Sequence, residues 1–186
     1  MPYLYGERIR LRAVEKEDIP IFLDWINDVD VTENLVLITP WSHTQEEQWY
    51  EAMLKRHIAE HVLVIEVKVE EDEQIYYPIG NCQFIDINWR NRSAEVGIMI
   101  GEKSYWDKGF GTEVMRVLLT HGFNSLNLNR IWLQVIAENK RGIRAYEKAG
   151  FVHEGVFRQD EYRQGKYHDV YIMSMLKDEW KNNRSN

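Results

Sequence analysis

The first part of the chain alternates polar and apolar residues in the manner of strands with one buried face. Residues 7–13 alternate in this way, and successive side chains of a strand point to opposite faces of a sheet. An acidic turn at residues 70–73 separates two later stretches that are apolar or alternating. We therefore expect strands over four segments: 7–13, 61–69, 75–87 and 93–100.

Two helices are expected between the first and the second of these strands. Asp18 is a plausible N-cap for a helix over residues 18–27, and Pro20 is tolerated there because it falls in the first turn. The sequence Thr44-Gln45-Glu46-Glu47 has the form of a capping box. It predicts a second helix that continues to about Arg56.

The second half of the chain mixes helical and strand periodicity. Apolar residues between 114 and 123 recur at helical spacing, and the mostly apolar residues 130–137 are typical of a buried strand. Asn139 and Gly150 bracket a further helix over residues 140–149 as its N-cap and its stop. Two final strands, separated by a turn that contains glycine, complete the pattern: 151–159 and 169–176.

The order of these elements bounds the fold. Strands come first and are followed by strand, helix, strand, helix and two strands, which indicates an α+β or mixed α/β domain around a central sheet. No internal repeat or low-complexity linker interrupts the 186 residues. A single domain is therefore expected over residues 1–180, with a polar C-terminal tail at 181–186.

The net charge indicates which partners the protein favours, and the single cysteine indicates the compartment in which it works. The formal net charge is −7, which disfavours nucleic acid as a partner and favours cationic molecules. A single cysteine, Cys82, cannot form an internal disulfide, and no apolar run resembles a membrane span or a signal peptide. A cytoplasmic protein with a buried, unreactive Cys82 is expected. The scattered histidines match no metal-binding pattern, so no metal site is expected.

Candidate chemistry begins with residues 104–114, which read SYWDKGFGTEV. Gly109 and Gly111 stand at the expected start of a helix, where unpaired N–H groups and the helix dipole favour a phosphate. Lys108 adds a positive charge and Thr112 a hydroxyl group. A sharp entry turn without a ligand explains the glycines equally well. The dinucleotide fingerprint lacks its third glycine, and no P-loop is present.

The same residues carry a resemblance to a known family. Trp106-Asp107-Lys108-Gly109-Phe110-Gly111 resembles the pyrophosphate loop Q/R-x-x-G-x-G/A of the GNAT superfamily of acetyl-CoA-dependent N-acetyltransferases, with Trp106 at the Q/R position. The wider pattern Y-W-x-K-G-x-G/A-T-E is similar to its ribosomal-protein and spermidine N-acetyltransferase-like branch. A second segment, 139–151, resembles the signature N-x-x-A-I-x-x-Y-E-K-x-G-F, with Gly142 in place of alanine. The resemblance covers nearly the whole chain.

The resemblance implies a fold and a reaction. The fold would be a central, mostly antiparallel sheet of about six to seven strands, flanked by about four helices and splayed in the middle for the cofactor. Acetyl-CoA would be the co-substrate, and the acetyl group would pass directly to a primary amine in a ternary complex. A homodimer is also implied as a possibility. The alternatives left open are a non-catalytic acyl-CoA sensor or interaction module on this fold, and a nucleotide-binding enzyme.

The resemblance also implies which residues hold acetyl-CoA. Edge backbone groups of the strand that ends at Ile100 would pair with the pantetheine arm, and the N–H of Met99 or Ile100 would bind the thioester oxygen. The glycine loop would bind the pyrophosphate, and Asn139 would hydrogen-bond the cofactor while capping its helix. The cofactor-binding residues expected are Ile98, Met99, Ile100, Trp106, Lys108, Gly109, Phe110, Gly111, Thr112 and Asn139.

Two residues are the candidates for catalysis. Tyr146 matches the family tyrosine that protonates the departing thiolate, although a tyrosine at this spacing is also typical of helix packing. Glu95 matches a strand glutamate that faces the acceptor, and it would act as the base directly or through water. An outward-facing strand glutamate is the other interpretation.

The acceptor would be a cationic amine in an acidic protein. Asp28, Asp30 and Glu33 would attract it and Trp41 would cover an apolar stem, although each is also typical of a surface residue. A protein N-terminus such as that of a ribosomal protein, a polyamine and an aminoglycoside or sugar amine all remain open.

Overall fold

The computed structural model describes residues 3–33, 35, 39–69 and 72–185. The chain divides into two compact units. Unit 1 comprises Met1–Phe84 and Ile98–Phe110, and unit 2 comprises Ile85–Gly97 and Gly111–Asn186. The strand order is β1-β2-β3-β4-β5-β6-β8-β7. Strands β4 (Asp72–Asn88) and β5 (Ser93–Ile100) contribute residues to both units.

Unit 1 combines an antiparallel group of strands with short helices. Strand β2 pairs with β1 and β3, and β3 pairs with β4, all antiparallel. Buried apolar side chains from helices and strands form one cluster of this unit, which includes Phe22, Trp25, Met53, Val64 and Met99. Its complete elements are β1 (Leu4–Tyr5), β2 (Ile9–Ala13), β3 (Leu63–Val69), α1 (Ile19–Ile26), α2 (Val29–Thr32), α3 (His43–Met53), and the 3-10 helices η1 (Lys16–Asp18), η2 (Ile58–Glu60) and η3 (Lys103–Tyr105).

Both helices expected in unit 1 exist. Asp18 occupies the N-cap position of α1 as predicted, but its side chain makes no capping hydrogen bond. Asp18 directly precedes α1, yet its carboxylate accepts hydrogen bonds from Arg12 at 2.7 Å and from the Glu15 N–H at 2.8 Å. At α3 the capping box consists of Ser42 and Gln45. The predicted box was therefore wrong by two residues, because serine already satisfies the free N–H groups upstream.

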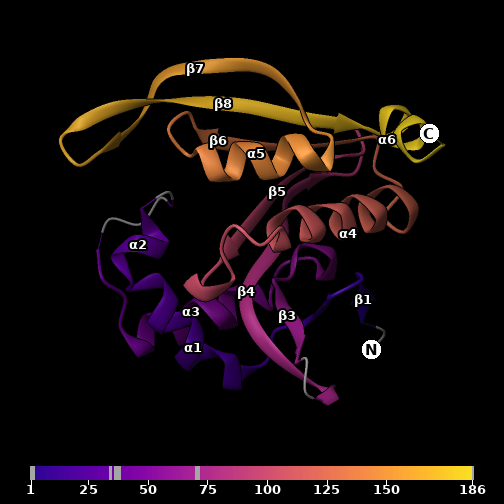
Figure 1. Ribbon diagram of the computed structural model, residues 1–186. Coiled ribbons are helices and arrows are strands. Elements are labelled where there is room, and N and C mark those ends of the chain that lie inside the picture. The colour runs from indigo at the N-terminus through magenta and orange to yellow at the C-terminus, as the bar shows by residue number, and fades with distance from the viewer. Residues whose placement is uncertain (1–2, 34, 36–38, 70–71, 186) are drawn as a thin grey trace. The chain divides into compact units, whose positions relative to one another are not determined.

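Unit 2 is built around a long hairpin (Figure 1). Strand β8 pairs antiparallel with both β6 and β7, and β5 pairs parallel with β6. The parallel register covers only Ser93–Glu95 against Arg130–Trp132, which agrees with the expected splaying of the sheet. The elements are α4 (Phe110–Asn124), β6 (Arg130–Ile136), α5 (Lys140–Ala149), β7 (Val152–Arg163), β8 (Lys166–Leu176) and α6 (Lys177–Ser185).

The α+β class is confirmed, and the element counts need correction. The described residues form eight strands and six α-helices, rather than about six to seven strands and about four helices. The final hairpin is longer than expected because Gln164 and Gly165, with φ of 47° and 82°, make a two-residue turn of the kind that joins twisted strands directly. Residues of the predicted polar tail belong to α6.

Two further expectations concern the acidic turn at residues 70–73 and the burial of Cys82. Glu70 and Glu71 of the predicted acidic turn lie outside the described residues, and β4 begins at Asp72. Cys82 is buried with 1% exposure, and this burial raises the pKa of its thiol far above the ordinary value. The prediction of a buried Cys82 is therefore confirmed. Within the described residues, no helix has the length and apolar character needed to cross a membrane.

Candidate active site

The glycine loop of unit 1 has the geometry that its sequence predicts. Gly109 has φ of 84°, a left-handed conformation that glycine adopts without strain. A β-carbon there would have only the Arg8 guanidinium within reach, at 3.6 Å, so space remains open around this backbone. Arg8 also donates to the Lys108 carbonyl at 3.1 Å. Arg8 therefore anchors the turn at Lys108, while the backbone of Gly109 keeps open space around it.

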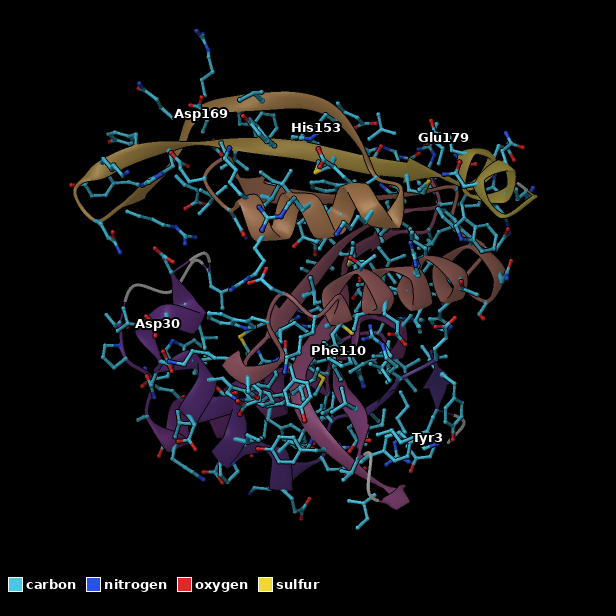
Figure 2. All side chains as sticks on the ribbon, viewed as in Figure 1. Tyr3, Asp30, Phe110, His153, Asp169 and Glu179 are labelled. Carbon is cyan, nitrogen blue, oxygen red and sulfur yellow. The ribbon has the colours of Figure 1, made fainter. Side chains whose placement is uncertain are left out.

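Arg8 contributes more to this loop than the sequence indicated. Its guanidinium lies 4.3 Å from the centroid of the Phe110 ring, and Phe110 meets Tyr105 edge-on at 5.4 Å. Figure 2 shows Phe110 at the start of α4. The alternating pattern over residues 7–13 had predicted only a strand, with no role assigned to Arg8. The contact with Lys108 spans 100 positions, and no local signal predicts it.

Helix α4 begins directly after Gly109, at Phe110. The first N–H groups of a helix have no partner within it, and the helix dipole favours an anion there. In unit 2, a β-carbon on Gly111 would lie 3.8 Å from the Ala145 β-carbon, an ordinary contact. Thr112 is buried and its hydroxyl donates to the Ala145 carbonyl at 3.2 Å. The open glycine backbone and the free N–H groups fit a pyrophosphate.

Strand β5 offers its backbone in an alternating pattern. Gly101 donates to the Ile79 carbonyl of β4 at 2.9 Å. Because successive residues of a strand direct their N–H groups to opposite sides, the N–H of Ile100 points away from β4, whereas that of Met99 points toward it. The Met99 carbonyl also lies against Gly80, where a β-carbon would approach it to 2.1 Å. Of the two candidate donors, only Ile100 is directed away from the neighbouring strand.

Trp106 lies partly buried after η3. Its indole N–H donates to the Ile100 carbonyl at 2.8 Å, and its ring packs against the apolar cluster of unit 1. Gly101, between the two, leaves room for the Trp25 ring, which a β-carbon would approach to 2.1 Å. Trp106, which was expected to bind the cofactor, thus holds the end of β5 at Ile100.

Helix α5 positions two predicted site residues of unit 2. Asn139 caps the helix as predicted, and its side-chain oxygen accepts the Gly142 N–H at 2.9 Å. A β-carbon on Gly142 would lie 2.8 Å from the Asn139 amide nitrogen, so an alanine here, as in the family signature, would require the Asn139 side chain to shift. Tyr146 packs against Phe151 with ring centroids 6.2 Å apart. Desolvation raises the pKa of Tyr146 to about 12.

Glu95 lies on β5 in a partly buried position. Burial is the main cause that raises the pKa of its carboxyl group, and the negative charge of Asp86 adds to it. Asp86 lies exposed on the neighbouring strand β4 with φ of 49°. A raised pKa makes Glu95 a better proton acceptor when it is ionised. Asp86 was not predicted as a site residue, because its stretch of sequence predicted only a strand over residues 75–87.

The acidic residues of unit 1 are partly neutralised within the chain. Lys103 contacts the carboxylates of Asp28 at 2.7 Å and Asp30 at 2.9 Å. Asp28 also caps α2 by accepting the Asp30 N–H at 2.9 Å, and Figure 2 shows Asp30 on that helix. Glu33, at the end of α2, is exposed. The structure brings Asp28 and Asp30 together around an ammonium group that sequence reasoning did not pair with them.

Trp41 is fixed through its backbone. Its N–H donates to the Asn27 side chain at 2.8 Å, and its carbonyl accepts from the same amide at 2.9 Å. The ring is partly buried. These contacts hold the segment before α3 against the end of α1.

Comparisons with known proteins agree on one family. The family model described as "Acetyltransferase (GNAT) domain" matches residues 8–152. The uncharacterized N-acetyltransferase p20 of Bacillus licheniformis is 34% identical over 181 residues, covering 97% of this chain and 99% of that protein. The spermidine N(1)-acetyltransferase of Vibrio cholerae is 32% identical over 182 residues, covering 95% and 98%.

A solved structure extends this agreement to three dimensions. The crystal structure of spermidine N-acetyltransferase from Vibrio cholerae in complex with CoA and spermine matches with a TM-score of 0.85 and 29% identity. The match covers 95% of this chain and 100% of that one. This chain therefore belongs to the GNAT acetyltransferase family, as an acetyl-CoA-dependent N-acetyltransferase.

Proposed function

We propose that this enzyme transfers the acetyl group of acetyl-CoA directly to a primary amine of a polyamine. The observation that carries the choice of acceptor is the pair of carboxylates, Glu95 and Asp86, close enough on β5 and β4 for one charge to raise the pKa of the other. Such a pair is stabilised by a guest with more than one positive charge. Relatives named for spermidine, and a neighbour solved with spermine, support the same class.

The cofactor is proposed to bind through backbone groups. Its pyrophosphate takes the N–H groups from Lys108 to Thr112, with Arg8 and Lys108 supplying positive charge. The pantetheine arm takes the side of β5 that faces away from β4. The N–H of Ile100 then binds the thioester oxygen, because the Met99 N–H, the other candidate donor, is directed toward β4. Asn139 retains its role as cap and cofactor contact.

The chemistry follows from the protonation states of two side chains. Glu95 takes a proton from the acceptor ammonium, directly or through water, and passes it to solvent. The neutral nitrogen then attacks the thioester carbon and loses its second proton to water as the amide forms. A C–N bond forms as the C–S bond breaks, and the oxygen's developing charge is stabilised by the Ile100 N–H. Tyr146, which a pKa of about 12 keeps protonated, donates its proton to the leaving sulfur and regains one from solvent.

A polyamine fits these groups better than a peptide N-terminus does. A peptide presents one ammonium group, whereas a polyamine places a second one within reach of Asp86. Asp28 and Asp30 add less attraction than their number implies, because Lys103 already pairs with both. A non-catalytic sensor on this fold is disfavoured because a proton donor and a carboxylate base are both present.

The acceptor is tested by thiol release from acetyl-CoA with three amines: spermidine, a monoamine of similar length and a short peptide with a free N-terminus. Spermidine is expected to have the lowest KM. Asp86→Asn should raise the KM for spermidine about three- to tenfold, since a close charge pair contributes about 1 kcal/mol, and should leave the monoamine KM within twofold. Equal effects on both amines, or faster turnover of the peptide, would contradict the assignment.

Two expectations about organisation remain proposals. The single N-acetyltransferase domain over residues 1–180 is supported by the family match to residues 8–152. A homodimer is supported by exposed apolar side chains on β7, among them Val156 and Phe157 with 48% and 50% exposure. Light scattering during size-exclusion chromatography measures the assembly, and a monomer at working concentration would contradict the dimer.

A further inference from the structure

The peptide between Ile100 and Gly101 is held on both sides, by a backbone hydrogen bond to β4 and by a side-chain hydrogen bond from Trp106. Strand β5 ends at Ile100, and the next two residues, Gly101 and Glu102, both donate their N–H groups to the Ile79 carbonyl of β4. Alternation along the strand therefore directs both the N–H and the C=O of Ile100 away from β4. The parallel register with β6 covers only Ser93–Glu95 of β5, so Ile100 lies beyond it.

The Ile100 carbonyl finds its donor six residues later. The Trp106 indole N–H reaches it at 2.8 Å, and this bond closes the loop that contains η3. The indole is fixed in turn, because its ring packs on the cluster that includes Met99 and its backbone N–H donates to the Lys103 carbonyl at 3.1 Å. The packed indole therefore fixes the Ile100–Gly101 peptide plane. Through the Ile100 backbone, it also restrains the direction of the Ile100 N–H.

We propose that Trp106 is a positioning residue, whose indole N–H holds the Ile100 carbonyl and thereby orients the Ile100 N–H toward the acyl end of acetyl-CoA. This inference rests on the proposed binding of the pantetheine arm along β5. It assigns Trp106 no direct contact with the cofactor. The side-chain N–H is the essential feature, because glutamine and arginine, the residues of the superfamily pattern at this position, also carry N–H donors on long side chains.

The same hydrogen bond also restrains the start of the loop that follows Trp106. Asp107, Lys108 and Gly109 follow directly, and Gly109 adopts its left-handed conformation before α4 begins. One end of this turn is held at Trp106 and the other by the Arg8 contact to the Lys108 carbonyl. Loss of the indole N–H would free the first anchor, while the second would remain.

The test compares Trp106→Phe with Trp106→Gln. Phenylalanine keeps an aromatic ring for packing and removes the donor, whereas glutamine restores a donor and removes the ring. Calorimetry without an amine gives the Kd for acetyl-CoA, and steady-state assays give kcat and KM for both substrates. Trp106→Phe should raise the Kd and the acetyl-CoA KM about fivefold, as expected when a carbonyl loses its donor, with the amine KM unchanged. Trp106→Gln should restore the Kd to within about twofold.

Trp49→Phe is the matched control, because Trp49 packs on the same cluster from α3. It should lower the melting temperature and leave the Kd for acetyl-CoA unchanged. The proposal is overturned if Trp106→Phe binds acetyl-CoA as the wild type does, or if Trp106→Gln binds as weakly as Trp106→Phe. A wild type that binds acetyl-CoA but turns over no amine refutes the proposed function alone, because the Kd comparison still stands. A wild type that does not bind acetyl-CoA refutes both.

A measurement on the wild type covers the case in which a variant does not fold. In a ¹⁵N-labelled sample, the Trp106 indole N–H should exchange slowly with solvent, and the Ile100 amide resonance should shift on addition of acetyl-CoA. A Trp106 indole that exchanges as fast as an exposed one overturns the proposal.

Discussion

Replacement of Tyr146 by phenylalanine tests the proton donor of the reaction. The ring packs against Phe151 and its surroundings are desolvated, which raises the pKa of its phenol to about 12. Tyr146 is therefore protonated at neutral pH, as a donor must be. The Tyr146→Phe variant removes one hydroxyl group and keeps the ring, so the packing against Phe151 is preserved.

The expected loss of kcat depends on how the pKa of Tyr146 compares with the pKa of the leaving thiol. General acid catalysis contributes about 10²- to 10⁴-fold, and a donor with a pKa of about 12 is a weaker acid than an ordinary thiol, which has a pKa of about 8.5 in a cysteine side chain. A desolvated thiolate is itself more basic, as burial shows for Cys82 in this protein. We therefore expect kcat to fall about 100-fold, the low end of the range, with the acetyl-CoA KM changed less than about threefold.

The assay is thiol release at saturating acetyl-CoA between about pH 7 and pH 10, with Tyr162→Phe as control. Tyr162 is 62% exposed on the hairpin, and its variant should behave as the wild type. The wild-type kcat should show no alkaline decrease from Tyr146 in this range. An unchanged kcat in Tyr146→Phe would refute the donor role. An alkaline decrease near pH 10 that disappears in the variant would refute the effect of burial.

Three further substitutions test the loop, the base and a buried acid. Gly109→Ala should lower the free energy of unfolding by about 1–2 kcal/mol, because its φ is 84°, whereas Gly111→Ala should be neutral or stabilising; equal effects by thermal denaturation would argue against the loop geometry. Asp86→Asn should shift the acid limb of kcat/KM, assigned to Glu95, to lower pH, because one of the causes that raise the Glu95 pKa is removed; an unmoved limb would exclude Glu95 as the group observed. Glu46 is buried, and desolvation raises the pKa of its carboxyl group to about 7, so the folded state holds its proton more tightly than the unfolded chain does. The free energy of unfolding of the wild type should therefore fall as pH rises from about 4.5 to 7, and Glu46→Gln should remove about 1–2 kcal/mol of that fall after allowance for solvent screening; parallel pH curves for the two proteins in chemical denaturation would contradict it.

The elements best predicted from the sequence carry their signals locally. The strand expected over residues 93–100 is β5, and the helix expected over 140–149 is α5, with Asn139 and Gly150 as its cap and stop. Both follow from alternation and from capping, which depend on neighbours along the chain. The ends of the last hairpin were missed, because a two-residue turn leaves little sequence between strands.

Contacts between distant residues could not be predicted in this way. Arg8 reaches Lys108 across 100 positions, and Lys103 reaches Asp30 across 73. Their partners depend on how strands and helices pack, and a single sequence carries no signal for such pairs. The predicted role of Trp106 illustrates the limit, because the motif located the residue, whereas its hydrogen bond to Ile100 was visible only in the structure.

The central claim is that this enzyme acetylates a polyamine from acetyl-CoA. The most direct measurement incubates the full chain with acetyl-CoA and spermidine, and compares thiol released with the mass of the amine recovered. Our account predicts one released thiol for each acetyl group gained by spermidine. Tight binding of coenzyme A without thiol release for spermidine or any other amine would contradict it.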